Sequence, residues 1–413
     1  MLNPDIFVLT DENGRLLPPS QQAAILAKYS RHPDSARDLL RKTSEASSEA
    51  FQEKWVVNYG HDSVAELATI PVCFEGVSII ASKEIEKLQR PGCSEKSTRM
   101  QKFNRDQMLW PTDDLKRAQG DLVDRLFDLY DDVLGWLGEK GVPEKKAFDV
   151  ARSILPAGVR TNLALVAYPR DIAELIAKLG GSSNLEFQTI GSKLKEAVGS
   201  IGGPLIRHTE PNLWAQNWVP KKIPSRREFK RNEPHAALIH AFVDPKFMET
   251  ISRTYDMGED EFFEKMEERP IKAKIPDLFQ QIRVGFDVLM DYGAFRDIQR
   301  HRKMTQIVEP LTPNYGYITP EALLDSPFMA RFDSLMAFSE EAWTSDWASS
   351  YVVPMAFLHR SYYEMDLQQL YYLIELRTQP QGHISYRRIA WQMYQEASKL
   401  MPQYMRWCRV VKL

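Results

Sequence analysis

Four cations within eight residues form a cluster that could bind an anion. They are Arg296, Arg300, Arg302 and Lys303, and they lie at the end of a helix that we predict over residues 284–302. Two interpretations stay open. Cations at a helix C-terminus offset the helix dipole and face water, or their guanidinium planes bind a phosphate or an electron-rich, anionic ring.

A second set of candidates combines a hydroxyl with guanidinium groups. Ser97 and Arg99 are two residues apart, so in an extended segment both side chains lie on one side and suit a phosphate dianion. By itself this spacing is common in surface loops. Arg152 interrupts the apolar end of a helix just before Pro156, and Arg377 ends a similar apolar run. Because a cation in such a place usually has an anionic partner, we expect one at each position.

Other kinds of catalytic site find less support. The chain has eight histidines but no His-x-x-x-His or Cys-x-x-Cys spacing, so we expect no metal site, even around His61. Cys93 has no histidine paired with it in the nearby sequence and is predicted to be an inert thiol. The chain has no glycine-rich phosphate loop, so a nucleotide would not be bound by such a turn.

The elements that must position these residues occur twice in the chain. Residues 88–90 match residues 298–300, while Pro156 matches Pro354 and Leu179 matches Arg377, the last two pairs at the same offset of 198 residues. A repeat of this length predicts two related domains rather than a solenoid. Each copy lacks what the other keeps, so we expect one active site shared by two degenerate copies.

Local patterns predict an α+β fold in which helices dominate and pack on a mixed or antiparallel sheet. We expect the first copy at residues 1–210, a crossover linker at 211–234 and the second copy at 235–413. Ser35 is a candidate N-cap after a break near Pro33. The predicted elements are helices over residues 18–56, 77–90 and 115–140 and strands over residues 5–9, 68–74, 163–167 and 236–243.

Composition limits the kinds of protein this chain can be. Its 413 residues, 43% apolar and 26% charged, are enough for two or three soluble domains. There is no run of about 18 apolar residues and no signal-peptide pattern, and three cysteines indicate a reducing compartment. We therefore expect a cytoplasmic protein that does not bind a membrane.

Charge gives little support for nucleic acid as a partner. The formal net charge is −3, so no general attraction to polyanions is expected. The basic segment at residues 202–234, which also contains Trp214 and Trp218, is more simply a solvated linker than a nucleic-acid-binding arm.

Taken together, these residues resemble the flavin-dependent thymidylate synthases over nearly the whole chain, as two tandem copies of that domain. The family signature is Arg-His-Arg, a serine and Glu-x-Ser-x-Arg, preceded by a His-x-Thr-Pro-Phe-Glu segment. The first copy matches the Glu-x-Ser-x-Arg loop and the arginine of an Ala-Arg-x-x-Leu-Pro segment, and the second matches the triplet and a late arginine. These residues are Glu95, Ser97, Thr98, Arg99 and Arg152 in the first copy, and Arg300, His301, Arg302 and Arg377 in the second.

The resemblance also implies flavin-binding residues in the first copy. His61, Ser63 and Glu66 fall on the His-x-Thr-x-x-Glu positions, Ser30 matches an Ala-Arg-x-Ser segment, and Arg170 matches a flavin-contacting arginine. With Arg300, His301 and Arg302 they would form the cofactor site.

Departures from the family pattern divide between the copies. The first copy loses the triplet in what we predict to be a shortened loop after Arg90, and Leu179 replaces its late arginine. The second copy has neither the Ser-x-Arg loop nor the His-x-Thr-x-x-Glu segment, and Ser350 replaces the arginine of the Leu-Pro segment. Other changes are Met100 for a tyrosine, Thr305 for a serine, and Pro310-Leu311-Thr312 for Ser-x-Arg.

In the family each site lies between subunits of a homotetramer, and the retained residues divide along that same boundary. The resemblance therefore implies a working composite site and a homodimer that imitates the tetramer. NADPH would reduce FAD, the flavin would pass a hydride to the uracil ring of dUMP, and methylenetetrahydrofolate would supply the one-carbon unit. Ser97, Arg99 and Arg152 would bind the phosphate, Arg377 the polarised ring, and Arg300 with Arg302 the reduced flavin.

Two alternatives to this function stay open. The substrate could be another pyrimidine nucleotide, which Met100 and Asp297 near the expected pocket permit. The protein could also be a non-catalytic nucleotide-binding descendant of the synthase. Flavin content separates the enzymes from the non-catalytic protein.

Overall fold

The computed structural model describes residues 9–30, 32–43, 62–223 and 229–413. They form two compact units, which we describe separately. Unit 1 consists of Met1–Val77, Leu88–Lys96 and Thr161–Val219, and unit 2 of Ser78–Lys87, Ser97–Arg160 and Pro220–Leu413. Segments of the first repeat thus belong to unit 2. The repeat boundaries given above stay a prediction, since the compact units divide the chain in another way.

Unit 1 is built on a three-stranded sheet in the order β1-β3-β2. Strand β2 (Gly92–Glu95) pairs with β3 (Arg160–Ala167) in antiparallel fashion. Buried and exposed residues alternate along β3, so one face of the sheet is covered and the other faces water. The remaining elements are β1 (Ile70–Ser78), α1 (Pro19–Tyr29), α2 (Ala36–Lys42), α7 (Pro169–Gly180), α8 (Leu185–Gly202) and the 3-10 helices η2 (Asp62–Glu66), η5 (Gly203–Leu205) and η6 (Leu213–Trp218).

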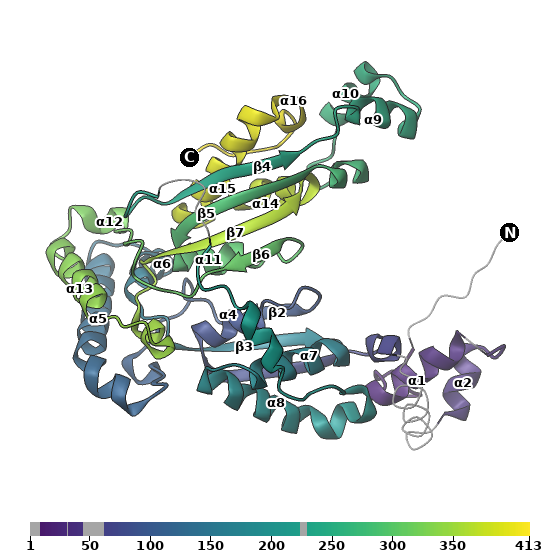
Figure 1. Ribbon diagram of the computed structural model, residues 1–413, viewed down its shortest axis with the longest axis horizontal. Coiled ribbons are helices and arrows are strands. Elements are labelled where there is room, and N and C mark those ends of the chain that lie inside the picture. The colour runs from purple at the N-terminus through teal and green to yellow at the C-terminus, as the bar shows by residue number, and fades with distance from the viewer. Residues whose placement is uncertain (1–8, 31, 44–61, 224–228) are drawn as a thin grey trace. The chain divides into compact units, whose positions relative to one another are not determined.

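Unit 2 contains a four-stranded antiparallel sheet in the order β4-β5-β7-β6 (Figure 1). Its strands are β4 (His235–Phe242), β5 (Arg283–Asp291), β6 (Thr305–Val308) and β7 (Leu358–Asp366). Helices α14 (Leu367–Arg377) and α15 (Ile384–Leu400) pack against this sheet and bury its core, which includes Phe286, Val288 and Tyr363.

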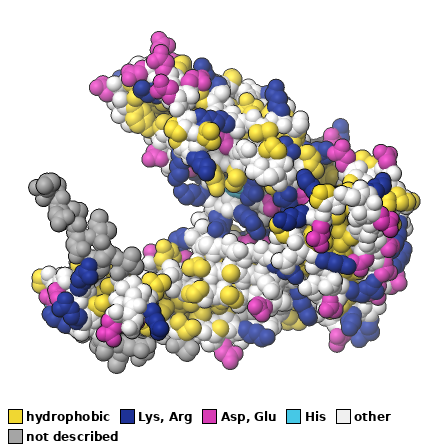
Figure 2. All heavy atoms as spheres, turned by 180° about the vertical axis from the view of Figure 1, so that it is seen from behind, with side chains coloured by type: hydrophobic (Ala, Val, Ile, Leu, Met, Phe, Trp, Pro, Cys, Tyr) yellow, Lys and Arg dark blue, Asp and Glu magenta, His cyan; other side chains and the backbone are white. Residues whose placement is uncertain are grey.

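The other helices of unit 2 extend this core. The long α5 (Asp113–Glu139) packs on α13 (Met329–Glu341). Acidic side chains gather over α9 and α10, as Figure 2 shows. The elements are α4 (Ile79–Ile85), α6 (Glu144–Ala151), α9 (Phe247–Tyr255), α10 (Glu259–Glu267), α11 (Tyr292–Ile298), α12 (Glu321–Leu324), α16 (Pro402–Met405), η3 (Arg105–Gln107), η4 (Arg152–Ile154), η7 (Asp277–Gln281) and η8 (Trp347–Val352).

The two Leu-Pro segments of the repeat pair with each other inside unit 2. Ala157 donates its N–H to Val353 and Met355 donates to Leu155, each at 2.9 Å. The two bonds are equivalent, because Ala157 and Leu155 of the first copy match Met355 and Val353 of the second at the offset of 198 residues. Pro156 and Pro354 form an isolated β-bridge between them. The copies therefore meet through a self-complementary contact of the kind that relates subunits of a symmetric dimer.

Secondary structure confirms the repeat and corrects part of its alignment. Strand β7 begins 198 residues after the start of β3, whereas β6 begins 213 residues after the start of β2. Each short strand begins seven residues after the preceding helix, at Gly92 after Ile85 and at Thr305 after Ile298. The predicted shortened loop is therefore wrong, because Lys87-Leu88-Gln89 stands where the second copy has Arg300-His301-Arg302.

Several predicted elements are confirmed and two are wrong. Ser35 caps α2 by accepting the N–H of Asp38, and the long amphipathic helix is α5. The helix predicted over residues 284–302 is strand β5 followed by the short α11, and the helix predicted over residues 77–90 is helical only as α4. Strand β5 is buried on both faces, so its sequence lacks the alternation that distinguishes a strand from a buried helix.

The other predicted strands are found with small shifts in their ends. Those predicted over residues 68–74, 163–167 and 236–243 are β1, β3 and β4, while residues 5–8 of the remaining one lie outside the described part of the chain. Within that part, no helix has the length and apolar character needed to span a membrane.

The contact between the repeats makes a prediction about Gly158. A Cβ at this position would lie 2.7 Å from the backbone oxygen of Tyr351 and 2.8 Å from Cε of Met108. We expect Gly158→Ala to lower the free energy of unfolding by about 1–3 kcal/mol, because backbone cannot move aside easily. Gly120→Ala, in α5 with no atom within 4 Å of the new Cβ, should instead raise it by about 0.5–1 kcal/mol. Urea denaturation of both variants checks this, and equal stabilities would contradict it.

Candidate functional site

Arg99 lies in a turn, not in the extended segment that we predicted. The N–H of Met100 bonds to the carbonyl of Ser97, and the Ser97 hydroxyl accepts the N–H of Arg99 at 3.2 Å. The guanidinium of Arg99 forms a two-point pair with Asp149, at 2.6 and 3.2 Å. It also donates to the hydroxyl of Tyr386 at 3.3 Å. Arg99 is thus held in place by groups that the sequence did not identify.

Arg152 has the anionic partners that its buried position predicted. It is 3% exposed, and its Nη1 donates to Asp297 at 3.2 Å while its Nε lies 3.8 Å from Asp149. Its Nη2 is buried and has no hydrogen-bond partner in the described part of the chain. Gly293 permits this packing, because a Cβ there would lie 3.3 Å from Nε of Arg152. An anion in the site could use the donor at Nη2.

Thr98 is a buried residue whose hydroxyl has a partner within unit 2. It is 2% exposed, and its hydroxyl accepts a hydrogen bond at 3.0 Å from Arg296, which is itself buried in α11. Its expected role as a substrate-binding residue stays a prediction. Arg296 of the second copy instead fixes the turn that contains Ser97 and Arg99 of the first.

Arg377 has a neutral partner in place of the expected anion. Its Nε donates to Nε2 of His301 at 2.8 Å. Burial, with a contribution from Arg377, lowers the pKa of His301 to about 3, so the imidazole is neutral and accepts this bond. Its Nδ1 lies 3.2 Å from the side-chain amide of Gln369. The imidazole therefore orients Arg377, whose charge is not neutralised by the contact.

Asp297 is surrounded by cations from both repeats. Burial by itself would raise its pKa, but Arg152, Arg377, Arg99 and Arg300 together outweigh that effect and lower it. The carboxylate is therefore ionised at neutral pH. Arg99 and Arg377 also lie beside the same ring, with their guanidinium carbons 5.9 and 5.3 Å from the centre of Tyr386.

The remaining cations of the cluster at residues 296–303 lie beyond the helix. Helix α11 ends at Ile298, so Arg300 and Arg302 are not part of a helix, contrary to the prediction. Arg300 and Lys303 are exposed and Arg302 is partly exposed. No salt bridge joins any of these three to a carboxylate in the described residues, so their charge is available to an anionic group such as a flavin.

Three residues of this site were missed from the sequence. Asp149 and Tyr386 bind Arg99, and His383 lies with its Nε2 3.8 Å from Asp149. Burial, followed by Arg152 and Arg99, lowers the pKa of His383 well below its usual value. Asp149 lies three residues before Arg152, a helical spacing that could have suggested it, but Tyr386 lies in α15, beyond the end of α14 at Arg377, and nothing in the local pattern pointed to it.

Among the described residues, the second copy has other residue types at the positions that match this site. Pro310, Leu311 and Thr312 stand where the first copy has its Ser-x-Arg turn, and Leu311 is buried with its carbonyl bonded to the hydroxyl of Ser350 at 2.8 Å. Ser350 occupies the position of Arg152. The loop is therefore closed by its own contacts.

The crossover linker contacts Glu309, the residue just before this loop, and Arg360 of β7. Arg360, 1% exposed, pairs with both oxygens of Asp287 and donates to the carbonyl of Ile223 at 2.5 Å. Glu309 accepts the N–H of Ile223 at 2.7 Å, and the ring of Phe229 lies 4.3 Å from the guanidinium carbon of Arg360. The linker thus provides partners for the buried charges of Arg360 and Glu309.

The proposed flavin residues of the first copy lie in unit 1. Glu66 accepts hydrogen bonds from Arg90 at 2.8 Å and from Arg170 at 3.0 Å, and Arg170 also lines a cavity of about 370 Å³. The hydroxyl of Ser30 bonds to Ala27 at the end of α1. Glu95 is a buried residue of β2. His61 and the side chain of Ser63 lie outside the described residues.

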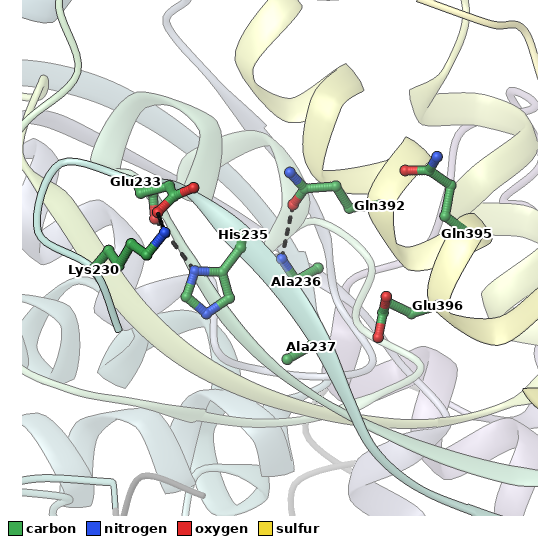
Figure 3. Close-up of a pocket in the computed structure, with 8 residues that line it drawn as sticks. All are labelled: Lys230, Glu233, His235, Ala236, Ala237, Gln392, Gln395 and Glu396. Carbon is green, nitrogen blue, oxygen red and sulfur yellow. Dashed lines mark hydrogen bonds and ion pairs between the residues drawn. The ribbon is translucent and has the colours of Figure 1, made fainter. Parts of the chain in front are cut away.

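Another pocket, of about 350 Å³, lies in unit 2 between residues 230–237 and α15 (Figure 3). Lys230 lies 3.7 Å from Glu233, and Gln392 accepts the N–H of Ala236 at 2.9 Å. The pocket contains no arginine among its lining residues. It therefore lacks the paired donors expected of a phosphate site.

Comparisons with known proteins agree with the tandem arrangement. The family model described as "Thymidylate synthase complementing protein" matches residues 16–181 and again residues 238–403. The chain is 26% identical to a UPF0159 protein of Chlamydia pneumoniae, over 98% of this chain and 91% of that protein, and 26% identical to the UPF0159 protein Ta1429 of Thermoplasma acidophilum, over 92% and 93%. It is also 26% identical to the flavin-dependent thymidylate synthase of Sulfolobus acidocaldarius, over 39% of this chain and 62% of that enzyme.

Two solved structures share a more distant similarity. One is the UMP/dUMP methylase PolB of Streptomyces cacaoi bound with 5-Br dUMP, with 12% identity and a TM-score of 0.34, over 44% of this chain and 86% of that one. The other is the flavin-dependent thymidylate synthase of Helicobacter pylori with FAD and dUMP, with 17% identity and a TM-score of 0.34, over 46% and 95%.

The buried histidines predict how stability depends on pH. The pKa of His301 and that of His359, each lowered mainly by burial, are about 3. Between pH 6.5 and about 4 each binds a proton in the unfolded chain but not in the folded one, so the free energy of unfolding should fall by about 1.4 kcal/mol per pH unit per histidine as the pH decreases.

Urea unfolding of the wild type and of a His301→Gln, His359→Gln double variant measures this. The variant should lose less stability between pH 7 and pH 5, whereas both proteins should change equally between pH 7 and pH 8. An equal loss in both proteins at the lower pH would contradict the prediction.

Proposed function

Since this chain belongs to the thymidylate synthase complementing protein family, we propose that it is a flavin-dependent thymidylate synthase. It would convert dUMP to dTMP with methylenetetrahydrofolate as the one-carbon donor and NADPH as the reductant. One observation supports this above others. Within unit 2, Arg99 and Arg152 of the first copy and Arg377 of the second lie around Asp297, although they come from distant parts of the chain.

Three residues would bind the phosphate of the nucleotide. Arg152 provides the unpaired donor at Nη2, and the turn that contains Ser97 and Arg99 provides a hydroxyl and a second guanidinium. In the structure Arg99 is paired with Asp149, so it would either share its donors with the phosphate or exchange the carboxylate for it.

Arg377 would act on the pyrimidine ring. Methylation at C5 requires that this carbon act as a nucleophile, and it does so when the ring is an enolate, which carries negative charge on a ring carbonyl oxygen. A guanidinium oriented in advance stabilises that charge, and His301 provides the orientation while staying neutral. In the net reaction the ring loses its C5 proton and gains a methylene carbon and a hydride.

The cofactor would be FAD, held in unit 2 by Arg300, His301 and Arg302. The exposed or partly exposed guanidinium groups of this loop, unpaired with carboxylates of the described residues, fit an anionic and electron-rich group. A bound flavin would accept electrons from NADPH and provide them as the hydride. The flavin-binding roles of Ser30, His61, Ser63, Glu66 and Arg170 belong to the same proposal.

The second candidate function is methylation of another pyrimidine nucleotide. Asp297 favours it, because an ionised carboxylate inside the site can accept hydrogen bonds from groups that differ between nucleotides. A homodimer that imitates the family tetramer, in the cytoplasm, completes the proposal.

The cofactor proposal predicts a yellow protein. We expect the purified protein to contain non-covalent FAD, visible in its absorption spectrum. Arg302→Ala should weaken FAD binding more than dUMP binding, and Arg99→Ala should do the reverse, each by about 10- to 100-fold for the loss of a charge-assisted contact. Fluorescence titration with FAD and calorimetric titration with dUMP measure both. A colourless protein that takes up no FAD would support the non-catalytic descendant.

The composite site predicts one dUMP per chain despite two copies of the domain. The opposite combination of residues has Leu179 and Ser350 in place of two arginines. Losing two such contacts weakens binding by about 3–6 kcal/mol, or about a hundredfold to ten-thousandfold. Calorimetry of the FAD-loaded protein should give one site. Two equal sites per chain would refute the composite model.

A further inference from the structure

Asp297 has a carboxylate that the proposed phosphate and ring contacts do not use. Its side chain is 17% exposed and accepts one hydrogen bond, from Nη1 of Arg152 at 3.2 Å. No other residue in the described part of the chain donates to it. An ionised carboxylate can accept about four hydrogen bonds, so most of this capacity is left for a ligand.

The neighbours of Asp297 include arginines that we assign to both ends of the nucleotide. Arg152, which we assign to the phosphate, donates to it, and Arg99 and Arg377, assigned to the phosphate and to the ring, lie close enough to lower its pKa. The sugar of a nucleotide lies between its phosphate and its base. A sugar bound between these arginines would lie near the carboxylate and would present hydroxyl donors to it.

We propose that Asp297 binds a sugar hydroxyl of the nucleotide and so selects nucleotides by their sugar. This inference rests on the proposed function, because it assumes that a pyrimidine nucleotide binds between these arginines. A carboxylate that accepts from ribose hydroxyls is a recurring element of nucleotide sites. The arginines keep Asp297 ionised, so it acts as an acceptor and not as a donor.

A comparison of three ligands tests the proposal by calorimetry. They are dUMP, 2′,3′-dideoxyuridine 5′-monophosphate, which lacks the 3′-hydroxyl, and UMP, which adds the 2′-hydroxyl. The wild type should bind dUMP about tenfold more tightly than the dideoxy nucleotide, since a hydrogen bond to a charged group is lost, and should bind UMP at least as tightly as dUMP. Asp297→Ala should remove the difference between dUMP and the dideoxy nucleotide.

Two variants serve as controls. Asp297→Asn keeps the shape of the side chain and should reduce the tenfold preference to about threefold, because a neutral acceptor forms a weaker bond. This variant carries the test if Asp297→Ala does not fold. Asp325→Ala, which changes an exposed aspartate elsewhere in unit 2, should keep the wild-type preference.

The outcomes separate this inference from the proposed function. If the wild type binds dUMP and the dideoxy nucleotide equally, or if Asp297→Ala weakens both by the same factor, Asp297 only supports Arg152 and the inference is wrong. If the wild type prefers dCMP to dUMP and Asp297→Ala removes this preference, the carboxylate binds the base instead of the sugar, and the inference is wrong. If no pyrimidine nucleotide binds the wild type, the proposed function itself fails.

Discussion

The paired Leu-Pro segments are the contact on which the described site depends. Four backbone hydrogen bonds between residues 153–158 and 351–356 join the two copies inside unit 2, and they fall into two pairs related by the 198-residue shift. Arg152 begins the 3-10 helix before the first segment, and β7 and then α14, which ends at Arg377, follow the second. This contact therefore fixes both arginines with respect to the same backbone.

Electrostatic balance explains why carboxylates accompany these arginines. Arg152 is almost completely buried, and a buried cation without a partner would cost several kcal/mol. Asp149 and Asp297 offset that cost while leaving the cations in excess, so the site retains a net attraction for an anion. Neutral His301 orients Arg377 without reducing its charge, which a carboxylate at the same position could not do.

In the second copy, a buried cation is neutralised by carboxylates and by the linker backbone. Arg360 is paired with Asp287 and Glu309, and the linker residue Ile223 satisfies both Arg360 and Glu309 through its backbone. Because the two copies lie in one chain, one set of residues can keep ligand-binding chemistry while the other becomes part of the core. Duplication thus permits an asymmetry that identical subunits cannot have.

Local sequence determined the features that depend on near neighbours. The Ser35 cap, the amphipathic α5, the repeat and the anionic partner of Arg152 could all be predicted, because capping, helical periodicity and the cost of a buried cation act over a few residues. The family resemblance, which the family model confirms, rested on short motifs that keep their spacing along the chain.

Tertiary structure decided what depends on distant residues. Strand β5 could not be distinguished from a helix because burial on both faces removes the alternation of a strand. Likewise, the hydroxyl of Thr98 accepts a hydrogen bond from Arg296, 198 residues away in the sequence. Asp149 accepts one from Arg99, 50 residues away. Such partners are chosen by the packing of elements far apart in sequence, which no local spacing encodes.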